Sequence, residues 1–109
     1  MFTSEIVGPH DATIRGTGKL NMVSAPALRE AVLALINDER HNVVVDLSGV
    51  DFVDSSGLGA LVACLKSTRQ AGCDLRIAAP GKQVLMVLKL SNLDRVFPIF
   101  TSAEEAINA

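Results

Sequence analysis

Short runs of branched aliphatic residues alternate along the chain with longer segments whose apolar residues recur every three or four positions. Short aliphatic runs are typical of buried β-strands, and the longer spacing is typical of helices with one buried face. The strands predicted from this pattern are residues 2–7, 12–16, 43–47, 75–79 and 96–100. The predicted helices begin near residues 24, 55, 84 and 102, and the second is expected to end near residue 70.

Turn-forming and capping residues mark the boundaries of these elements. The segment Gly8–Asp11 contains a proline and predicts a hairpin between the first two strands. Residues 16–21, which contain two glycines, are expected to form a loop, and residues 48–53 are expected to form a connection. Ser24 is the expected N-cap of the first helix, with Pro26 in its first turn.

The later helices carry their own start and stop signals. Gly72 predicts the end of the second helix, and Asn92 is expected to end the third in a left-handed conformation. The segment Ser102–Glu105 predicts a capping box that opens a final short helix. The expected buried stripe of the second helix consists of Leu58, Leu61, Val62 and Leu65.

After the first two strands, helices and strands alternate to the end of the chain. Alternation of this kind predicts a mainly parallel sheet, because each pair of parallel strands needs a helical crossover. We therefore expect one α/β domain over residues 1–109. Its mixed, mostly parallel sheet of about five strands has an antiparallel hairpin at the N-terminal edge, and about four helices lie largely on one face.

Charge and aromatic content exclude several classes of partner. The chain has 12 acidic and 10 basic side chains, which gives no electrostatic basis for binding nucleic acid or an anionic membrane. Its aromatic residues are 4 Phe without Trp or Tyr, so the usual stacking platforms for nucleic acids are missing. No apolar run approaches the roughly 20 residues that span a bilayer, and the N-terminus does not resemble a signal peptide. We expect no membrane insertion and a cytoplasmic location.

The cysteines form no recognisable metal or redox motif. Cys64 falls in the second predicted helix and is expected to be buried, and Cys73 lies beside a turn. Their spacing fits neither a CxxC pair nor a zinc clip. We therefore expect neither a metal nor a cofactor.

The segment Asp54–Leu61 carries the most informative chemistry in the chain. It follows a predicted buried strand and opens an apolar helix, so a carboxylate and two hydroxyls lie at a helix N-terminus. Ser55 or Ser56 can cap this helix, which stabilises it by roughly 1 kcal/mol. A serine here can also carry a phosphate that a helix N-terminus tolerates and a binding partner does not.

Catalytic and nucleotide-binding interpretations of the same region fail on spacing. A nucleophile elbow needs glycine where Val53 stands, and both histidines, His10 and His41, precede the serines. The segment Gly57–Gly59 begins like a dinucleotide fingerprint, but Val62 occupies the place of the last small residue. A receiver-type Mg²⁺ site would need an acidic pair in the first strand, which the sequence lacks.

The segment Val50–Gly59 (VDFVDSSGLG) resembles the signature of STAS domains, the fold of the anti-sigma factor antagonists. The resemblance covers nearly the whole chain, since residues 18–21, 43–47 and 91–93 also fall in register with the family pattern. It implies a regulatory binding protein, not an enzyme, in a partner-switching pathway that controls transcription. The unphosphorylated antagonist of such a pathway binds an ATP-binding serine kinase that doubles as an anti-sigma factor.

The resemblance also implies roles for individual residues. Ser55, the first serine after the aspartate, is the residue that the kinase phosphorylates, which releases the antagonist, and a PP2C-type phosphatase removes the phosphate. Asn21 stands where the family usually carries Asp, which keeps a hydrogen-bonding oxygen and loses the charge. The expected partner-binding residues are Asn21, Asp54, Ser55, Ser56, Gly57, Leu58, Gly59 and Lys66.

A second function is compatible with the same resemblance. The chain can be a STAS subunit of a lipid-transport ABC complex that docks on its ATPase without phosphorylation. The paired serines favour the antagonist, because docking alone requires no kinase-accessible serine. A monomer is the simplest expectation for either function.

Overall fold

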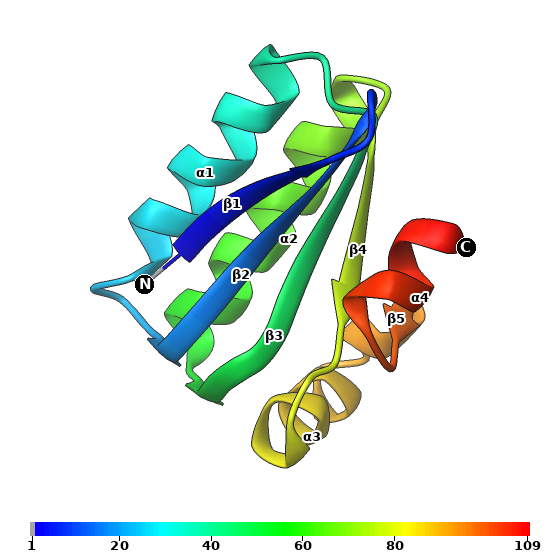
Figure 1. The fold of residues 1–109 in the computed structure, drawn as a ribbon. Coiled ribbons are helices and arrows are strands. Elements are labelled where there is room, and N and C mark those ends of the chain that lie inside the picture. The colour runs from blue at the N-terminus through cyan, green and yellow to red at the C-terminus, as the bar shows by residue number, and fades with distance from the viewer. Residues whose placement is uncertain (1) are drawn as a thin grey trace.

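Within residues 2–109, which the computed structural model describes, five strands form one sheet whose spatial order follows the chain (Figure 1). The first pair of strands is antiparallel and every later neighbouring pair is parallel. This arrangement confirms the α/β fold class predicted from the alternation of strands and helices. The strands are β1 (Phe2–Val7), β2 (Asp11–Leu20), β3 (Asn42–Val53), β4 (Asp74–Ala78) and β5 (Ile99–Phe100).

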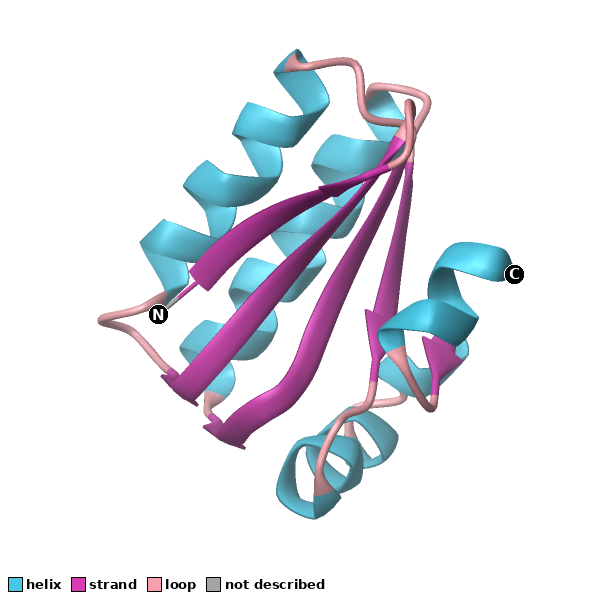
Figure 2. Cartoon of the chain, viewed as in Figure 1, coloured by secondary structure: helices cyan, strands magenta, loops and turns pink. Residues whose placement is uncertain are grey.

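The helices of the same residues are α1 (Ala25–Asn37), α2 (Ser55–Gln70), α3 (Lys82–Leu90) and α4 (Ala103–Asn108), with a 3-10 turn at Leu93–Arg95. α1 and α2 lie side by side against one face of the sheet, and α3 lies beyond the end of β3 (Figure 2). All three contribute to the main core. α4 lies apart from them and packs on Val44 and Ala78 through Ala106, in a small second apolar cluster. The helices are therefore largely, but not entirely, on one face, as expected.

β2 and β3 are both longer than predicted, and this difference shapes the site. The expected loop at 16–21 is strand as far as Leu20, and the expected connection at 48–53 is strand throughout. The two extensions pair with each other in parallel, with Leu20 opposite Val53, and the register shifts twice along them. Both of these side chains are buried, so tertiary pairing overrides the weak strand propensity of a glycine-rich sequence.

Smaller differences occur in the C-terminal third of the chain. β5 is confined to two residues instead of 96–100, because the amides of Val96 and Phe97 bond back to the Leu93 carbonyl and continue the turn that follows α3. Asn92 has a φ of 60°, so the left-handed end predicted for the third helix is confirmed. Ser102 accepts a hydrogen bond from the Glu105 amide, whereas the Glu105 carboxylate bonds to Thr101. Only the first half of the predicted capping box is therefore formed.

The buried stripe of α2 is rotated from the one expected. Leu61 and Leu65 are buried as predicted, but Val62 is 37 % exposed and Leu58 is only half-buried. The small residues Ala60 and Cys64 occupy the inward positions instead. Small side chains here let α2 pack close to its neighbours, which a stripe inferred from large residues alone does not reveal. No helix in residues 2–109 has the length and hydropathy needed to cross a bilayer.

Candidate functional site

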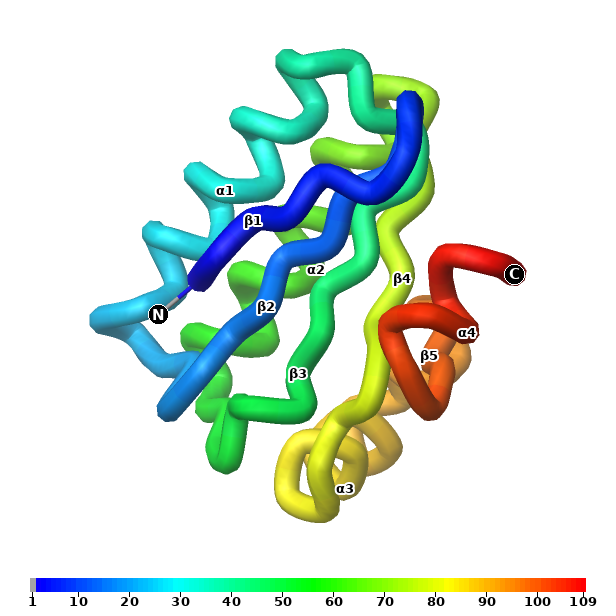
Figure 3. Tube along the Cα trace, viewed as in Figure 1, coloured from blue at the N-terminus to red at the C-terminus, as the bar shows by residue number. Residues whose placement is uncertain are grey.

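The predicted site lies at one end of the sheet, where β2 and β3 finish and α1 and α2 begin (Figure 3). Both helices therefore direct their N-terminal ends toward this edge. α3 lies against the end of β3 at the same edge. The predicted residues Asn21 and Asp54 follow directly after the two strands, so the fold brings them to one place.

Asp54, not a serine, caps α2. Its Oδ1 accepts a hydrogen bond of 2.8 Å from the Gly57 amide, and its backbone is extended as a cap requires. Ser55 and Ser56 occupy the first turn, and neither hydroxyl has a hydrogen-bond partner within residues 2–109. Ser55 is exposed and Ser56 is half-buried. Of the two roles that the sequence left open for these serines, capping is already filled by their neighbour.

The two glycines of α2 serve different purposes. A Cβ on Gly57 would collide with the carbonyl oxygen of Leu20 and lie 2.8 Å from Cγ2 of Val53. Gly57 therefore permits the close approach of α2 to β2, and it is buried. Gly59 is exposed, and a Cβ there would meet no other atom of residues 2–109 within 4 Å.

Asn21 organises the loop between β2 and α1. Its Oδ1 accepts hydrogen bonds from the amides of Val23 at 3.0 Å and Ser24 at 3.2 Å. Ser24 precedes α1 as predicted, but its side chain does not cap the helix and bonds instead to the Lys19 carbonyl at 2.7 Å. The carboxamide at position 21 thus supplies the oxygen that shapes this loop without adding a charge to it.

The loop and the start of α2 face each other across an open pocket of about 300 Å³. Its lining residues are Met22, Ala25, Pro26, Arg29, Ser56 and Gly59. Met22 and the adjacent Val23 are 73 % and 84 % exposed, which is unusual for such apolar side chains. Lys66 is exposed on α2, in one row with Ser55, Gly59 and Val62. We call the surface formed by residues 21–23, the pocket and this row on α2 the switch face.

Sequence reasoning missed Val23 and Arg29 of this face and one residue behind it. Val23 precedes the first predicted helix and Arg29 lies on it, so no linear pattern connects them with the serines. Gln83 of α3 bonds to the backbone of Val53, immediately before Asp54, although 30 positions separate the two residues. Only the folded structure brings α3 to this position.

The catalytic alternatives receive no support from the geometry. His10 and His41 stack with ring centroids 4.7 Å apart just before β2 and β3 begin, whereas Ser55 follows the end of β3. The Asp46 carboxylate accepts hydrogen bonds from Ser48 and Arg15. Within residues 2–109 there is no cluster of three or more His, Cys, Asp or Glu side chains placed to hold a metal ion.

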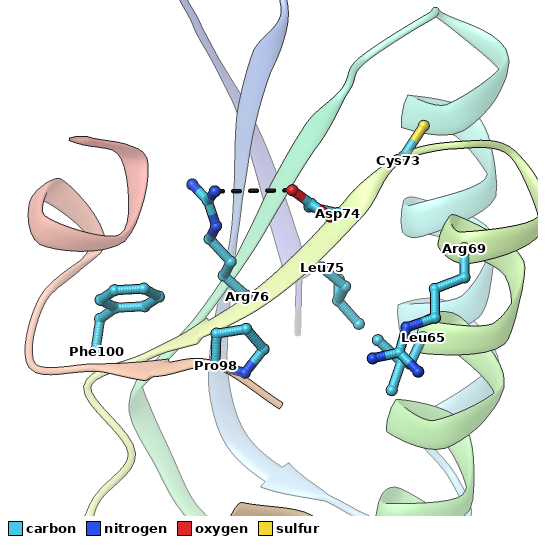
Figure 4. A pocket seen from close by; sticks show the side chains of 8 residues that line it. All are labelled: Leu65, Arg69, Cys73, Asp74, Leu75, Arg76, Pro98 and Phe100. Carbon is cyan, nitrogen blue, oxygen red and sulfur yellow. Dashed lines mark ion pairs between the residues drawn. The ribbon is translucent and has the colours of Figure 1, made fainter. Parts of the chain in front are cut away.

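A second pocket lies between α2, β4 and the segment around β5, at a distance along α2 from the serines (Figure 4). Cys73 lines it, and Arg76 forms an ion pair of 3.7 Å with Asp74. Arg76 also donates a hydrogen bond to the Ala106 carbonyl, which ties α4 to β4. This arrangement gives the arginine a structural role in the attachment of α4.

The cysteines are expected to differ sharply in reactivity. Cys64 is buried as predicted, and this burial raises the pKa of its thiol from 9.0 to about 11, with a smaller opposing effect from Arg29. At pH 8 roughly one thiol in a thousand is then ionised. We expect iodoacetamide at pH 8 to label the folded chain once, at Cys73, as measured by peptide mass mapping. Equal labelling rates for both thiols in the folded chain would contradict this, and denatured protein is the control in which both react.

The raised pKa of the Cys64 thiol also determines how the stability contributed by this buried thiol depends on pH. The folded-state pKa is higher than the unfolded-state value, so the stabilisation is complete below pH 9.0 and is lost as pH rises through about 11.

Comparison with known proteins identifies the family to which this fold belongs. The STAS domain family model matches residues 4–106. The anti-sigma-F factor antagonist RsfB of Mycobacterium tuberculosis is 30% identical over 90 residues, which cover 83% of this chain and 73% of RsfB. A crystal structure of an anti-sigma factor antagonist from Mycobacterium paratuberculosis has a TM-score of 0.87 at 28% identity, covering 99% of this chain and 91% of that one. The Bacillus cell fate determinant SpoIIAA in its phosphorylated form has a TM-score of 0.77 at 21% identity, covering 99% and 97%, and shows a shared fold.

Proposed function

The chain belongs to the STAS domain family, with anti-sigma factor antagonists among its relatives, and from this premise we propose that it is the switched partner of a serine kinase. In its unphosphorylated form it binds an ATP-binding kinase that also acts as an anti-sigma factor. Phosphorylation of Ser55 releases it, and a PP2C-type phosphatase restores the binding form. The chain acts in the cytoplasm as a monomeric regulatory binding protein and contributes no catalytic group.

The observation that carries this proposal is the state of Ser55. Its hydroxyl is exposed and has no hydrogen-bond partner within residues 2–109, because Asp54 already caps the helix. A kinase can therefore reach the hydroxyl without unfolding α2. The helix N-terminus tolerates the added phosphate, so phosphorylation leaves the fold intact and changes only the surface that a partner would bind.

The switch face offers a partner both apolar and charged contacts. Met22 and Val23 supply exposed apolar area beside the serines, and Lys66 supplies a positive charge along α2. Apolar anchors surrounded by polar residues are typical of protein interfaces. The other proposed contact residues are Asn21, Asp54, Ser56, Leu58 and Gly59. Gly57 is buried, and its role is to let α2 pack closely against β2.

The proposal predicts one phosphate at one serine. After incubation with ATP and each ATP-binding anti-sigma kinase of the source organism, intact mass should rise by one phosphate, and fragmentation should place it on Ser55. Ser55→Ala should abolish the gain and Ser56→Ala, its matched control, should retain it. A folded chain that gains no phosphate from any of these kinases would contradict the proposal and favour docking without phosphorylation, as in a transport complex.

A further inference from the structure

β3 extends beyond its neighbour on one side. β4 ends at Ala78, opposite Asp46, whereas β3 continues to Val53. Beyond Asp46, no strand of residues 2–109 lies beside the edge of β3 that faces away from β2. Val53 is 2 % exposed, and buried backbone N–H and C=O groups need hydrogen-bond partners.

Gln83 supplies both partners at this position. Its Oε1 accepts a hydrogen bond of 3.0 Å from the Val53 amide, and its Nε2 donates one of 3.2 Å to the Val53 carbonyl. A primary amide presents a donor and an acceptor side by side, so it takes the place of a missing strand. The side chain comes from α3, which the main core anchors through Val84 and Leu88. We call this pair of hydrogen bonds the Gln83 clamp.

The clamp acts next to the proposed phosphorylation site. Asp54, the residue after Val53, donates its amide to the Leu20 carbonyl at 3.2 Å, on the side of β2. Successive residues are thus held from opposite sides, by α3 and by β2. The Asp54 carboxylate then fixes the start of α2 through Gly57, and Ser55 lies between these anchors. The position of Ser55 therefore depends on α3, an element that contributes nothing to the switch face.

We propose that Gln83 is a positioning residue for Ser55, acting through Val53 and Asp54, and that it sets the geometry in which the hydroxyl is presented to the kinase. This inference rests on the proposed function. Gln83 itself lies behind the segment and is half-buried, so it need not touch the kinase. Misplacement of a reacting group by about 1 Å can reduce a reaction rate by about a hundredfold without loss of binding.

The first arm of the test uses the free protein and NMR hydrogen exchange. Gln83→Leu removes both hydrogen bonds at similar side-chain volume, and Gln83→Glu keeps only the acceptor at neutral pH. We expect the Gly57 amide, which is bonded to Asp54, to lose protection by about tenfold in both variants. The Ile77 amide, which bonds to Pro98, reports on the rest of the sheet and should be unchanged. Lys82→Gln, an exposed neighbour on α3, is the matched control.

The second arm measures phosphorylation kinetics with the kinase that modifies the unsubstituted chain. We expect kcat to fall by about tenfold or more for Gln83→Leu while KM stays within about twofold, because the switch face is intact. A loss of stability alone would not produce that separation. Unchanged kcat, or unchanged protection of Gly57, overturns the inference. If no kinase modifies the unsubstituted chain, the proposed function fails, and the exchange arm still decides whether the clamp positions the start of α2.

Discussion

Ser55→Asp is expected to weaken binding to the partner kinase by about a hundredfold or more, whereas Ser55→Ala should bind the kinase constitutively. The added carboxylate lies on the switch face, beside Asp54, where binding of the partner would remove it from water. An unpaired charge in an interface costs several kcal/mol, and each 1.4 kcal/mol corresponds to about a factor of ten in affinity. Titration calorimetry on the unphosphorylated chain and both variants measures the difference. A phosphate, with its larger charge, should act more strongly still.

A matched control for this charge exists elsewhere in the chain. Ser102 also lies at a helix N-terminus and is exposed, but it belongs to α4, on the other face of the sheet. Ser102→Asp adds the same charge and can still cap its helix, so binding should not change. If Ser55→Asp binds as tightly as the unsubstituted chain, or if Ser102→Asp is impaired to the same extent, the switch face is not where the partner binds.

Gly57→Ala is expected to lower the free energy of unfolding by about 3 kcal/mol, because the added methyl group would collide with the Leu20 carbonyl oxygen. Relief of that contact requires α2 to move away from β2, which also disturbs the site. Gly59→Ala is the matched control two residues later, since no other atom of the described part of the chain lies within 4 Å of its added Cβ. Alanine favours helix over glycine, so this second variant should gain up to about 1 kcal/mol.

Urea denaturation measures both glycine variants on one scale. The two midpoints should move in opposite directions from that of the unsubstituted chain, with unchanged slopes. A Gly57→Ala chain as stable as the parent would show that α2 does not need its close approach to β2. Equal destabilisation by both substitutions would show that α2 does not tolerate an added methyl group at either position, for a reason unrelated to the Leu20 contact.

Local signals predicted the helices of this fold better than they predicted its strands. The spacing of Leu61 and Leu65, with Gly72 as the stop, placed α2 at Ser55–Gln70. The extensions of β2 and β3 carry no such signal. Gly18 has a φ of 83°, and a Cβ on Gly49 would lie only 2.6 Å from the Gly16 carbonyl oxygen. These residues are strand because a neighbouring strand approaches closely, which propensity does not encode.

The candidate site also has one part that the sequence predicted and another that only the folded structure reveals. The segment Asp54–Gly59 is contiguous, so its composition and its place after a strand indicated a helix N-terminus with accessible hydroxyls. The exposed side chain of Val23 becomes part of the same surface because β2 ends beside β3. Gln83 was not predictable, since a glutamine on an amphipathic helix ordinarily faces solvent. Its role follows from the early end of β4.

Because the strands stand in space in the order in which they occur in the chain, the sheet can be assembled from the N-terminus during synthesis on the ribosome. Each new strand adds to an edge that earlier residues have already formed, and no later strand has to be inserted between two existing ones. β2, β3 and α2 are complete once Gln70 has emerged, but the Gln83 clamp is not. A nascent chain thus displays the segment Asp54–Ser56 before Gln83 can bond to Val53, and the hydrogen bonds that precede this segment are complete only when α3 has emerged.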